Sequence, residues 1–255
     1  MNAAATAPVV LRVEGLAKTF GGVRAVSNLS FTVAAGEVVA LIGPNGAGKT
    51  TCFNLVNGQL APDSGTVTLG DARIDGMPPR AIAALGVGRT FQVAATFASM
   101  TVRENIEVAL LARARAHARL ARPPAAAMRA ATDALLEQVR MTRFADQGAS
   151  TLAYGDAKRV ELALALAASP RLLLMDEPTA GMSPRSRGRV MQLAASLARE
   201  KSIAVLFTEH DMDVVFGFAD RVIVLDHGAI LAQGAPDAIR VDPRVQAVYL
   251  GTGAM

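Results

Sequence analysis

The pattern of apolar and polar positions divides the chain into short strands and helical segments. Residues 9–13 form a short apolar run, and residues 25–33 place apolar side chains between polar ones, so both segments predict strands. Residues 37–42 are almost continuously apolar, which is typical of a strand buried on both faces. Residues 171–175 and 203–208 predict two further short buried strands.

Helical patterns and turns connect these strands. Three segments have the helical pattern: 49–59, 77–89 and 184–200. Residues 62–76 are polar and contain glycine, which predicts a hairpin. A second hairpin is predicted around His227-Gly228, between the apolar runs 222–225 and 230–232.

A stretch rich in alanine and arginine separates the first strands from the later ones. Pro123-Pro124 divides it into two helical pieces, and we interpret residues 93–155 as a helical subdomain. Strands separated by helices predict a mainly parallel α/β sheet. Because 255 residues is near the upper size of a single hydrophobic core, the whole chain, 1–255, is expected to be one domain.

Composition excludes some classes of protein. The longest apolar stretch, Leu162 to Met175, is interrupted by Ser169-Pro170-Arg171, and a membrane span needs about 20 apolar residues, so no transmembrane helix is predicted. The first ten residues lack the basic and apolar regions of a secretory signal. Cys52 is the only cysteine, so no internal disulfide can form, which fits a reducing compartment.

Much of the net charge of +4 lies in one segment. Between Ala112 and Arg143 there are seven arginines against two acids, and Arg115, Arg119 and Arg122 share one face of the predicted helix. The plain interpretation is a solvated face. Contact with anionic lipid headgroups is an alternative. Nucleic-acid binding is disfavoured because no aromatic residues are interleaved with the arginines.

A glycine-rich loop carries the first chemical motif. Gly43-Pro-Asn-Gly-Ala-Gly48-Lys49-Thr50 fits the pattern G-x-x-x-x-G-K-[ST], between a buried strand and a helix. Glycines let the backbone N–H groups turn toward phosphate oxygens, and the helix adds its positive amino-terminal end. Lys49 can reach the β- and γ-phosphates, and the Thr50 hydroxyl can hold Mg²⁺.

Two adjacent acids form the second motif. Asp176 and Glu177 end the buried run Leu172 to Met175, which places them at the carboxyl end of a strand, where ligands lie in open α/β sheets. We expect Asp176 to hold Mg²⁺, directly or through water. Glu177 is the candidate general base for the attacking water.

Together these motifs resemble the nucleotide-binding subunits of ABC transporters. The resemblance implies a P-loop ABC-ATPase fold with an antiparallel β subdomain and a helical subdomain, and ATP and Mg²⁺ as ligands. It implies that Phe20 stacks on adenine, although a phenylalanine there can also be a core residue. Gln92 matches the glutamine that contacts Mg²⁺ and the attacking water. The loop residues implied to bind nucleotide are Gly43, Pro44, Asn45, Gly46, Ala47, Gly48, Lys49, Thr50 and Thr51.

The remaining family motifs follow in order. Leu152 to Arg159 occupies the signature position, so Ala153, Tyr154 and Gly155 are implied to contact the nucleotide held by a second subunit. The usual serine and glycine are replaced there by Ala153 and Tyr154. Residues 180–184 occupy the dimer-contact loop, with Ser183 where many members carry aspartate. His210 matches the switch histidine that contacts the γ-phosphate. His117 and His227 match no motif, and we interpret one as a solvated residue and the other as a turn residue.

The arrangement implied by the family needs partners. Two ATPase subunits, of the same or different chains, would enclose two ATP molecules, and hydrolysis would release the pair. The movement would pass to two transmembrane permease subunits, through residues 93–104, at the cytoplasmic face of the plasma membrane. In an importer a periplasmic solute-binding protein would act indirectly.

Three segments narrow the resemblance to one group. The string Leu152-Ala-Tyr-Gly155, residues 208–220 and the ending Val248-Tyr-Leu-Gly251 resemble ATP-binding proteins of bacterial importers for branched-chain amino acids, of the LivG type. Relatives of that group handle other amino acids or related small solutes. The alternatives are an ATPase of lipopolysaccharide export and a soluble ABC ATPase outside transport. A P-loop kinase would lack the signature motif and the switch histidine.

Overall fold

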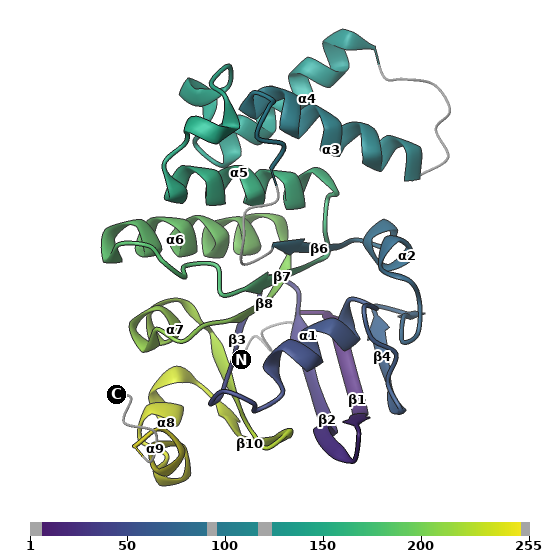
Figure 1. Ribbon diagram of the computed structural model, residues 1–255, viewed down its shortest axis with the longest axis vertical. Helices are drawn as coiled ribbons and strands as arrows, with labels where there is room; N and C mark the ends of the chain where they lie inside the picture. Colours follow the sequence, from purple (N-terminus) through teal and green to yellow (C-terminus); the bar gives the residue numbers. More distant parts are fainter. Residues whose placement is uncertain (1–6, 91–95, 117–123, 251–255) are drawn as a thin grey trace, which may run out of the picture.

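The computed structural model describes residues 7–90, 96–116 and 124–250 of the chain. Its strands form two sheets, and Figure 1 shows the helices distributed around and above them. Within these described ranges no helix is both long enough and apolar enough to span a membrane.

The smaller sheet is antiparallel and has the strand order β2-β1-β4-β5. Its strands are β1 (Val9–Phe20), β2 (Val23–Ala34), β4 (Ser64–Leu69) and β5 (Ala72–Arg73). The hairpin predicted over 62–76 is present as β4 and β5. β1 and β2 run further toward their shared turn than the apolar pattern indicated, because register shifts interrupt the alternation along β1.

The larger sheet is mainly parallel, as expected, with the order β10-β9-β3-β8-β7-β6. Its parallel strands are β3 (Val38–Ile42), β6 (Val87–Thr90), β7 (Leu172–Asp176), β8 (Ala204–Thr208) and β9 (Arg221–Asp226). β10 (Ala229–Gly234) pairs antiparallel with β9 in the predicted hairpin.

One prediction in this region was wrong. The segment 77–89 contains only the short helix α2 (Pro79–Ala84), and Val87–Thr90 forms the edge strand β6 instead. Gly86, with a φ of 102°, ends the helical region, and β6 then pairs with β7 along its whole length. Tertiary pairing therefore overrides the local helical pattern of this segment.

The central strands are buried on both faces. Val38, Ala40 and Ile42 of β3 belong to one hydrophobic cluster, whereas Val39 and Leu41 belong to the other. This division follows from the alternation of side chains along a strand. The helices packed beside the sheets are α1 (Lys49–Val56), α6 (Pro184–Lys201), α7 (Met212–Phe218), α8 (Pro236–Arg240) and α9 (Pro243–Leu250). α1 ends at Val56, three residues earlier than predicted, and α6 closely matches the prediction.

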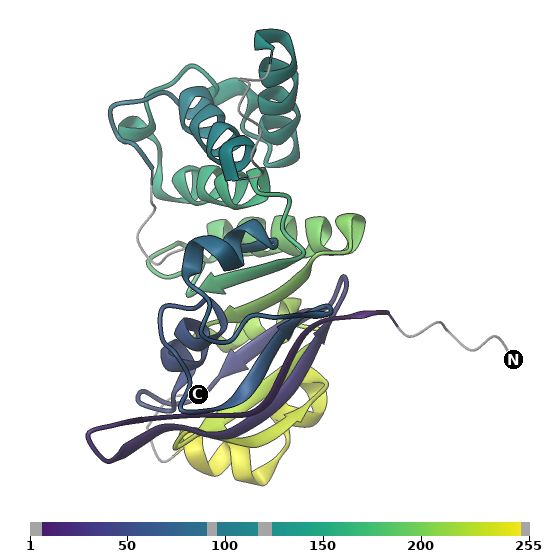
Figure 2. The same cartoon turned by 90° about the vertical axis from the view of Figure 1, so that its right-hand side faces the viewer.

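Three helices form a block at one end of the molecule, and their buried side chains join the hydrophobic cluster on one face of the larger sheet. They are α3 (Val102–Ala116), α4 (Ala125–Gln138) and α5 (Tyr154–Ala167), with the short 3₁₀ helices η1 (Thr142–Phe144) and η2 (Ala149–Thr151) between α4 and α5. Pro124 caps the start of α4, in agreement with a break at the proline pair. Figures 1 and 2 show that this block lies beyond α6, at the opposite end of the molecule from the β1–β2 hairpin.

Candidate functional site

The glycine-rich loop connects β3 to α1 and is packed tightly against its surroundings. Gly43, Gly46 and Gly48 all have positive φ angles, of 153°, 82° and 101°. A Cβ atom on Gly43 would lie 2.3 Å from the carbonyl oxygen of Leu225, and one on Gly48 would lie 2.3 Å from that of Ala25. These contacts exclude side chains at both positions, so the glycines let the loop lie against β9 and β2.

The loop leads into the amino-terminal end of α1, which no side chain caps. Gly48 is the N-cap of α1 and makes no side-chain capping hydrogen bond. The first N–H groups of a helix have no partners within the helix, so they form a ready anion site. Thr50 and Thr51 follow in the first turn of α1. This is the geometry expected of a phosphate-binding loop.

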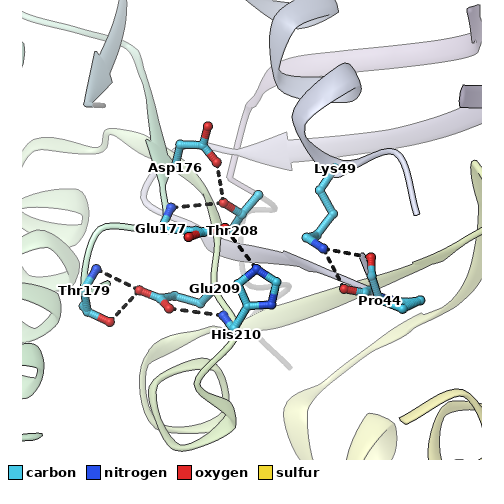
Figure 3. Close-up of polar contacts among 9 residues, drawn as sticks. Pro44, Lys49, Asp176, Glu177, Thr179, Thr208, Glu209 and His210 are labelled. Carbon is cyan, nitrogen blue, oxygen red and sulfur yellow. Dashed lines mark hydrogen bonds and ion pairs between the residues drawn. The ribbon is translucent and has the colours of Figure 1, made fainter. Parts of the chain in front are cut away.

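Lys49 lies folded over the same loop. Its Nζ atom donates to the carbonyl oxygens of Gly43 at 2.6 Å and Pro44 at 3.0 Å, and the residue is 8% exposed (Figure 3). Burial lowers the pKa of the Lys49 ammonium below its ordinary value, while the carboxylates of Glu177 and Asp176 act in the opposite direction. The structure therefore brings Lys49 near the two acids that end β7.

Asp176 is held by groups from two neighbouring strands. The hydroxyl of Thr208, at the end of β8, donates to Oδ1 of Asp176 at 2.8 Å. Arg89 of β6 forms an ion pair with Oδ2 at 3.3 Å. The Arg89 guanidinium also donates to Asn54 at 3.0 Å and to Gln59 at 2.9 Å, which ties the end of α1 to Asp176. Arg89 and Thr208 were not predicted as site residues.

Glu177 and His210 meet although they come from different loops. The Nε2 atom of His210 lies 2.9 Å from Oε1 of Glu177, and the backbone N–H of Glu177 donates to the Thr208 hydroxyl at 3.1 Å (Figure 3). Glu177 has a φ of 45°, a left-handed conformation that is uncommon for a residue with a side chain. Such strain is found where the surrounding structure holds a residue for function.

The signature residues start a helix of the helical block. Ala153 is the N-cap of α5, without a side-chain capping bond, and Tyr154 and Gly155 form its first turn. Tyr154 is exposed, and a Cβ on Gly155 would lie 3.5 Å from Ser186. Figures 1 and 2 both show α6 between α5 and α1. Within one chain these residues therefore belong to a different region of the surface from the glycine-rich loop.

Other predicted residues have clear positions. Phe20, at the tip of the β1–β2 hairpin, is 45% exposed, which excludes the alternative of a core phenylalanine. His227 is a turn residue, with a φ of 43° and an exposed ring. Gln92, His117, Arg119 and Arg122 lie outside the described residues, as does the start of the segment 93–104.

The carboxyl-terminal helix adds a contact that the sequence did not reveal. Burial raises the pKa of the Tyr249 hydroxyl to about 12, and a hydrogen bond from the backbone of Gly43 opposes that shift. Val248 lines a hollow of about 570 Å³ together with residues of the glycine-rich loop and the β9–β10 turn. α9 therefore lies beside the glycine-rich loop.

Comparison with known families gives two matches. Residues 26–180 match the family described as ABC transporter. Residues 229–254 match a second family, described as branched-chain amino acid ATP-binding cassette transporter. The first match includes the glycine-rich loop and the two acids, and the second includes β10, α8 and α9.

Curated relatives align along almost the whole chain. LivG, a high-affinity branched-chain amino acid transport ATP-binding protein of Salmonella typhimurium, is 41% identical over 95% of this chain and 98% of its own. BraF of Pseudomonas aeruginosa, with the same description, is also 41% identical over those shares. LptB of Haemophilus influenzae, a lipopolysaccharide export ATP-binding protein, is 35% identical over 95% of this chain and 97% of its own.

Solved structures have the same fold. The ADP conformation of an ATP-binding cassette of an ABC transporter superposes with a TM-score of 0.84 at 30% identity, covering 95% of this chain and 99% of that one. A dimeric cassette in a post-hydrolysis state, bound to ADP and phosphate, has a TM-score of 0.76 at 25% identity, covering 89% and 98%.

Proposed function

The chain belongs to the ABC transporter family, and on this basis we propose that it is the ATP-binding and ATP-hydrolysing subunit of an importer for branched-chain amino acids. The observation that carries the proposal is the 41% identity to LivG and BraF over nearly the whole length. The match of residues 229–254 favours the same group. The lipopolysaccharide export protein LptB, at 35% identity, is the less similar relative.

We assign ATP to the surface formed by the glycine-rich loop and the β1–β2 hairpin. The backbone N–H groups of residues 45–51 surround the phosphates, and the start of α1 stabilises their negative charge. Lys49 exchanges its two carbonyl partners for the β- and γ-phosphates. Phe20 is exposed, so its ring is available to stack on adenine.

The donors present fit Mg²⁺ bound together with nucleotide. No group of three or more His, Cys, Asp or Glu side chains that could hold a metal occurs in the described parts of the chain. Mg²⁺ commonly takes one or two carboxylates and completes its shell with water and substrate phosphates. Asp176 and the Thr50 hydroxyl supply oxygen donors of that kind, with Gln92 as the third predicted ligand. Bound Mg²⁺ would neutralise the charge on the phosphates.

Glu177 is assigned as the general base for hydrolysis. Its carboxylate accepts a proton from the attacking water as the water's oxygen bonds to the γ-phosphorus and the bond to the leaving ADP oxygen breaks. The His210 contact orients that carboxylate, and His210 can contact the γ-phosphate as the family resemblance implies. The backbone bond from Glu177 to Thr208 holds the residue at the end of β7.

We propose that a complete site needs a second ATPase subunit. Ala153, Tyr154 and Gly155 start a helix on a different region of the surface from the phosphate loop, so one chain cannot bring both to the same nucleotide. A related cassette is dimeric with ADP and phosphate bound. Each subunit would then supply Gly155 to its partner's nucleotide.

The remaining partners follow from the proposed importer. Two permease subunits would receive the movement of the dimer at the cytoplasmic face of the plasma membrane, and a periplasmic solute-binding protein would deliver the solute. The test is to purify this chain with its permeases and measure ATP hydrolysis with candidate solutes and their binding protein. Stimulation by leucine, isoleucine or valine supports the proposal. If only a lipopolysaccharide or an unrelated solute stimulates ATP hydrolysis, the proposal of a branched-chain amino acid importer is wrong.

A further inference from the structure

Glu209 is a buried acid that no motif of the nucleotide site includes. It lies between Thr208 and His210, directly after β8, and is 4% exposed. Burying a carboxylate is costly unless its oxygens accept hydrogen bonds. The bonds that Glu209 accepts therefore show which parts of the chain its charge holds together.

Glu209 connects the loops that follow β7 and β8. Its Oε1 atom accepts from the backbone N–H of Thr179 at 2.8 Å and from the Thr179 hydroxyl at 2.5 Å. Its Oε2 atom accepts from the backbone N–H of His210 at 3.2 Å. Figure 3 shows the carboxylate between these two residues, with the His210 ring extending on to Glu177. Hydrogen bonds to an ionised acceptor are stronger than those between neutral groups.

Thr179 is the residue immediately before the segment 180–184, which matches the dimer-contact loop. Thr179 is 2% exposed, and both its hydroxyl and its backbone N–H donate to Glu209. A second connection joins the same two loops: Arg187 of α6 donates to the Met182 carbonyl at 2.8 Å and forms an ion pair with Asp211. The two loops are therefore tied at both ends.

From these contacts we infer that Glu209 is a positioning residue that couples the segment 180–184 to His210, and through His210 to Glu177. Displacing the segment 180–184 would move Thr179. The hydrogen bonds from Thr179 to Glu209, and from the His210 backbone to Glu209, would transmit that movement to His210. Closure against a second subunit would then hold the His210 ring against Glu177, where it already lies 2.9 Å from Oε1, during hydrolysis. This inference rests on the proposed function, because it assumes that Glu177 acts as the general base.

Glu209→Gln is the variant that tests the coupling. The glutamine keeps the shape of the side chain and one acceptor oxygen for Thr179, but its amide group would face the His210 N–H, donor against donor. We expect the kcat for ATP hydrolysis by the full-length chain to fall about tenfold or more, as loss of a hydrogen bond to a charged group implies. The KM for ATP should change less than about twofold, because Glu209 has no hydrogen bond to the glycine-rich loop or to Phe20, the two parts assigned to hold the nucleotide. The control is Glu200→Gln, an exposed acid on α6, which should leave both constants unchanged.

A double-mutant cycle separates positioning from general stability. If Glu209 acts through His210, then adding Glu209→Gln to His210→Ala should slow single-turnover hydrolysis no further than about twofold. If the rate losses of Glu209→Gln and His210→Ala multiply in the double variant, the inference is wrong. It is also wrong if Glu209→Gln alone leaves kcat unchanged. If His210→Ala hydrolyses too slowly to measure, the same cycle is run with Thr179→Val and Glu209→Gln.

Two further variants keep the inference testable if Glu209→Gln does not fold. Thr179→Val removes the hydroxyl donor and leaves the carboxylate in place, so it should lower kcat with little change in KM. Thr179→Ser restores the donor and should recover the wild-type kcat. Failure of that recovery would count against the coupling. Wild-type chain that neither binds nor hydrolyses ATP would overturn the proposed function itself, whereas an active wild type with an equally active Glu209→Gln variant would overturn this inference alone.

Discussion

The Nε2 atom of His210 lies 2.9 Å from the Oε1 atom of Glu177, although 33 positions separate the two residues in the chain. The contact exists because β7 and β8 are neighbours in parallel register, with Asp176 opposite Thr208. Each strand ends at the same edge of the sheet, so the residues that follow them meet there. Lys49 lies near the same edge, where burial lowers the pKa of its ammonium and the carboxylates of Glu177 and Asp176 both act to raise it.

Replacing Glu177 by glutamine tests its role as the general base. The amide cannot accept a proton from water, so turnover should fall by about 10²-fold or more while ATP binding remains. ATP-bound dimers should then accumulate, which size-exclusion chromatography with ATP would show. Glu137→Gln, an exposed acid on α4, serves as the control. Hydrolysis at the wild-type rate by Glu177→Gln would assign the base elsewhere.

Replacing Lys49 by alanine tests the phosphate loop. The Lys49 ammonium is the buried cation of the loop, so its loss should weaken binding of a fluorescent ATP analogue at least about tenfold. Lys201→Ala, at the exposed end of α6, should bind the analogue as the wild type does. Equal affinities for Lys49→Ala and the wild type would contradict the assignment of this loop.

Replacing Phe20 by alanine tests stacking on the base. Loss of the ring should weaken ATP binding by about 1–3 kcal/mol, the range for aromatic stacking on a base. Val23→Ala is a matched control, because Val23 pairs with Phe20 across the hairpin and is 69% exposed. The comparison should be made by titration calorimetry. An affinity that falls equally in both variants would indicate a general effect of the hairpin.

The single cysteine gives a prediction for pH. Burial raises the pKa of the Cys52 thiol from 9.0 to about 12, so the folded protein should react very slowly with a thiol reagent at pH 8. Labelling should become fast only in denaturant, and mass spectrometry would follow it. Rapid labelling of the native chain would contradict the burial of Cys52.

The same shift affects stability at alkaline pH. Below pH 9 the raised pKa of Cys52 does not change the free energy of unfolding, because the thiol is neutral in both the folded and the unfolded chain. Above pH 9 the unfolded chain ionises first, so Cys52 should lower the free energy of unfolding by ~1.4 kcal/mol per pH unit up to about pH 12. Cys52→Ala should remove this part of the pH dependence in denaturant titrations, whereas an unaltered slope would exclude it.

The local elements of the fold were largely predictable, and the exceptions have physical causes. Buried strands such as β3 and β8 are recognisable because continuous apolar runs have few other uses in a chain of this composition. Val87–Thr90 was misassigned to a helix because its strand conformation depends on pairing with β7, whose residues lie more than 80 positions later. The lengths of β1 and β2 were underestimated for a similar reason: irregular register between paired strands leaves no regular alternation in the sequence.

The sequence alone was enough to predict a phosphate site in the glycine-rich loop, to pair the acids Asp176 and Glu177, and to identify the ATPase family that the comparisons confirm. These features are readable because a glycine-rich turn followed by a helix start, or an acid at a strand end, takes its chemistry from consecutive residues. Only the tertiary structure placed Arg89 on Asp176, Thr179 on Glu209 and Tyr249 against Gly43. The partners of a buried polar group depend on which strands and helices are neighbours, and no local pattern along the chain specifies those neighbours.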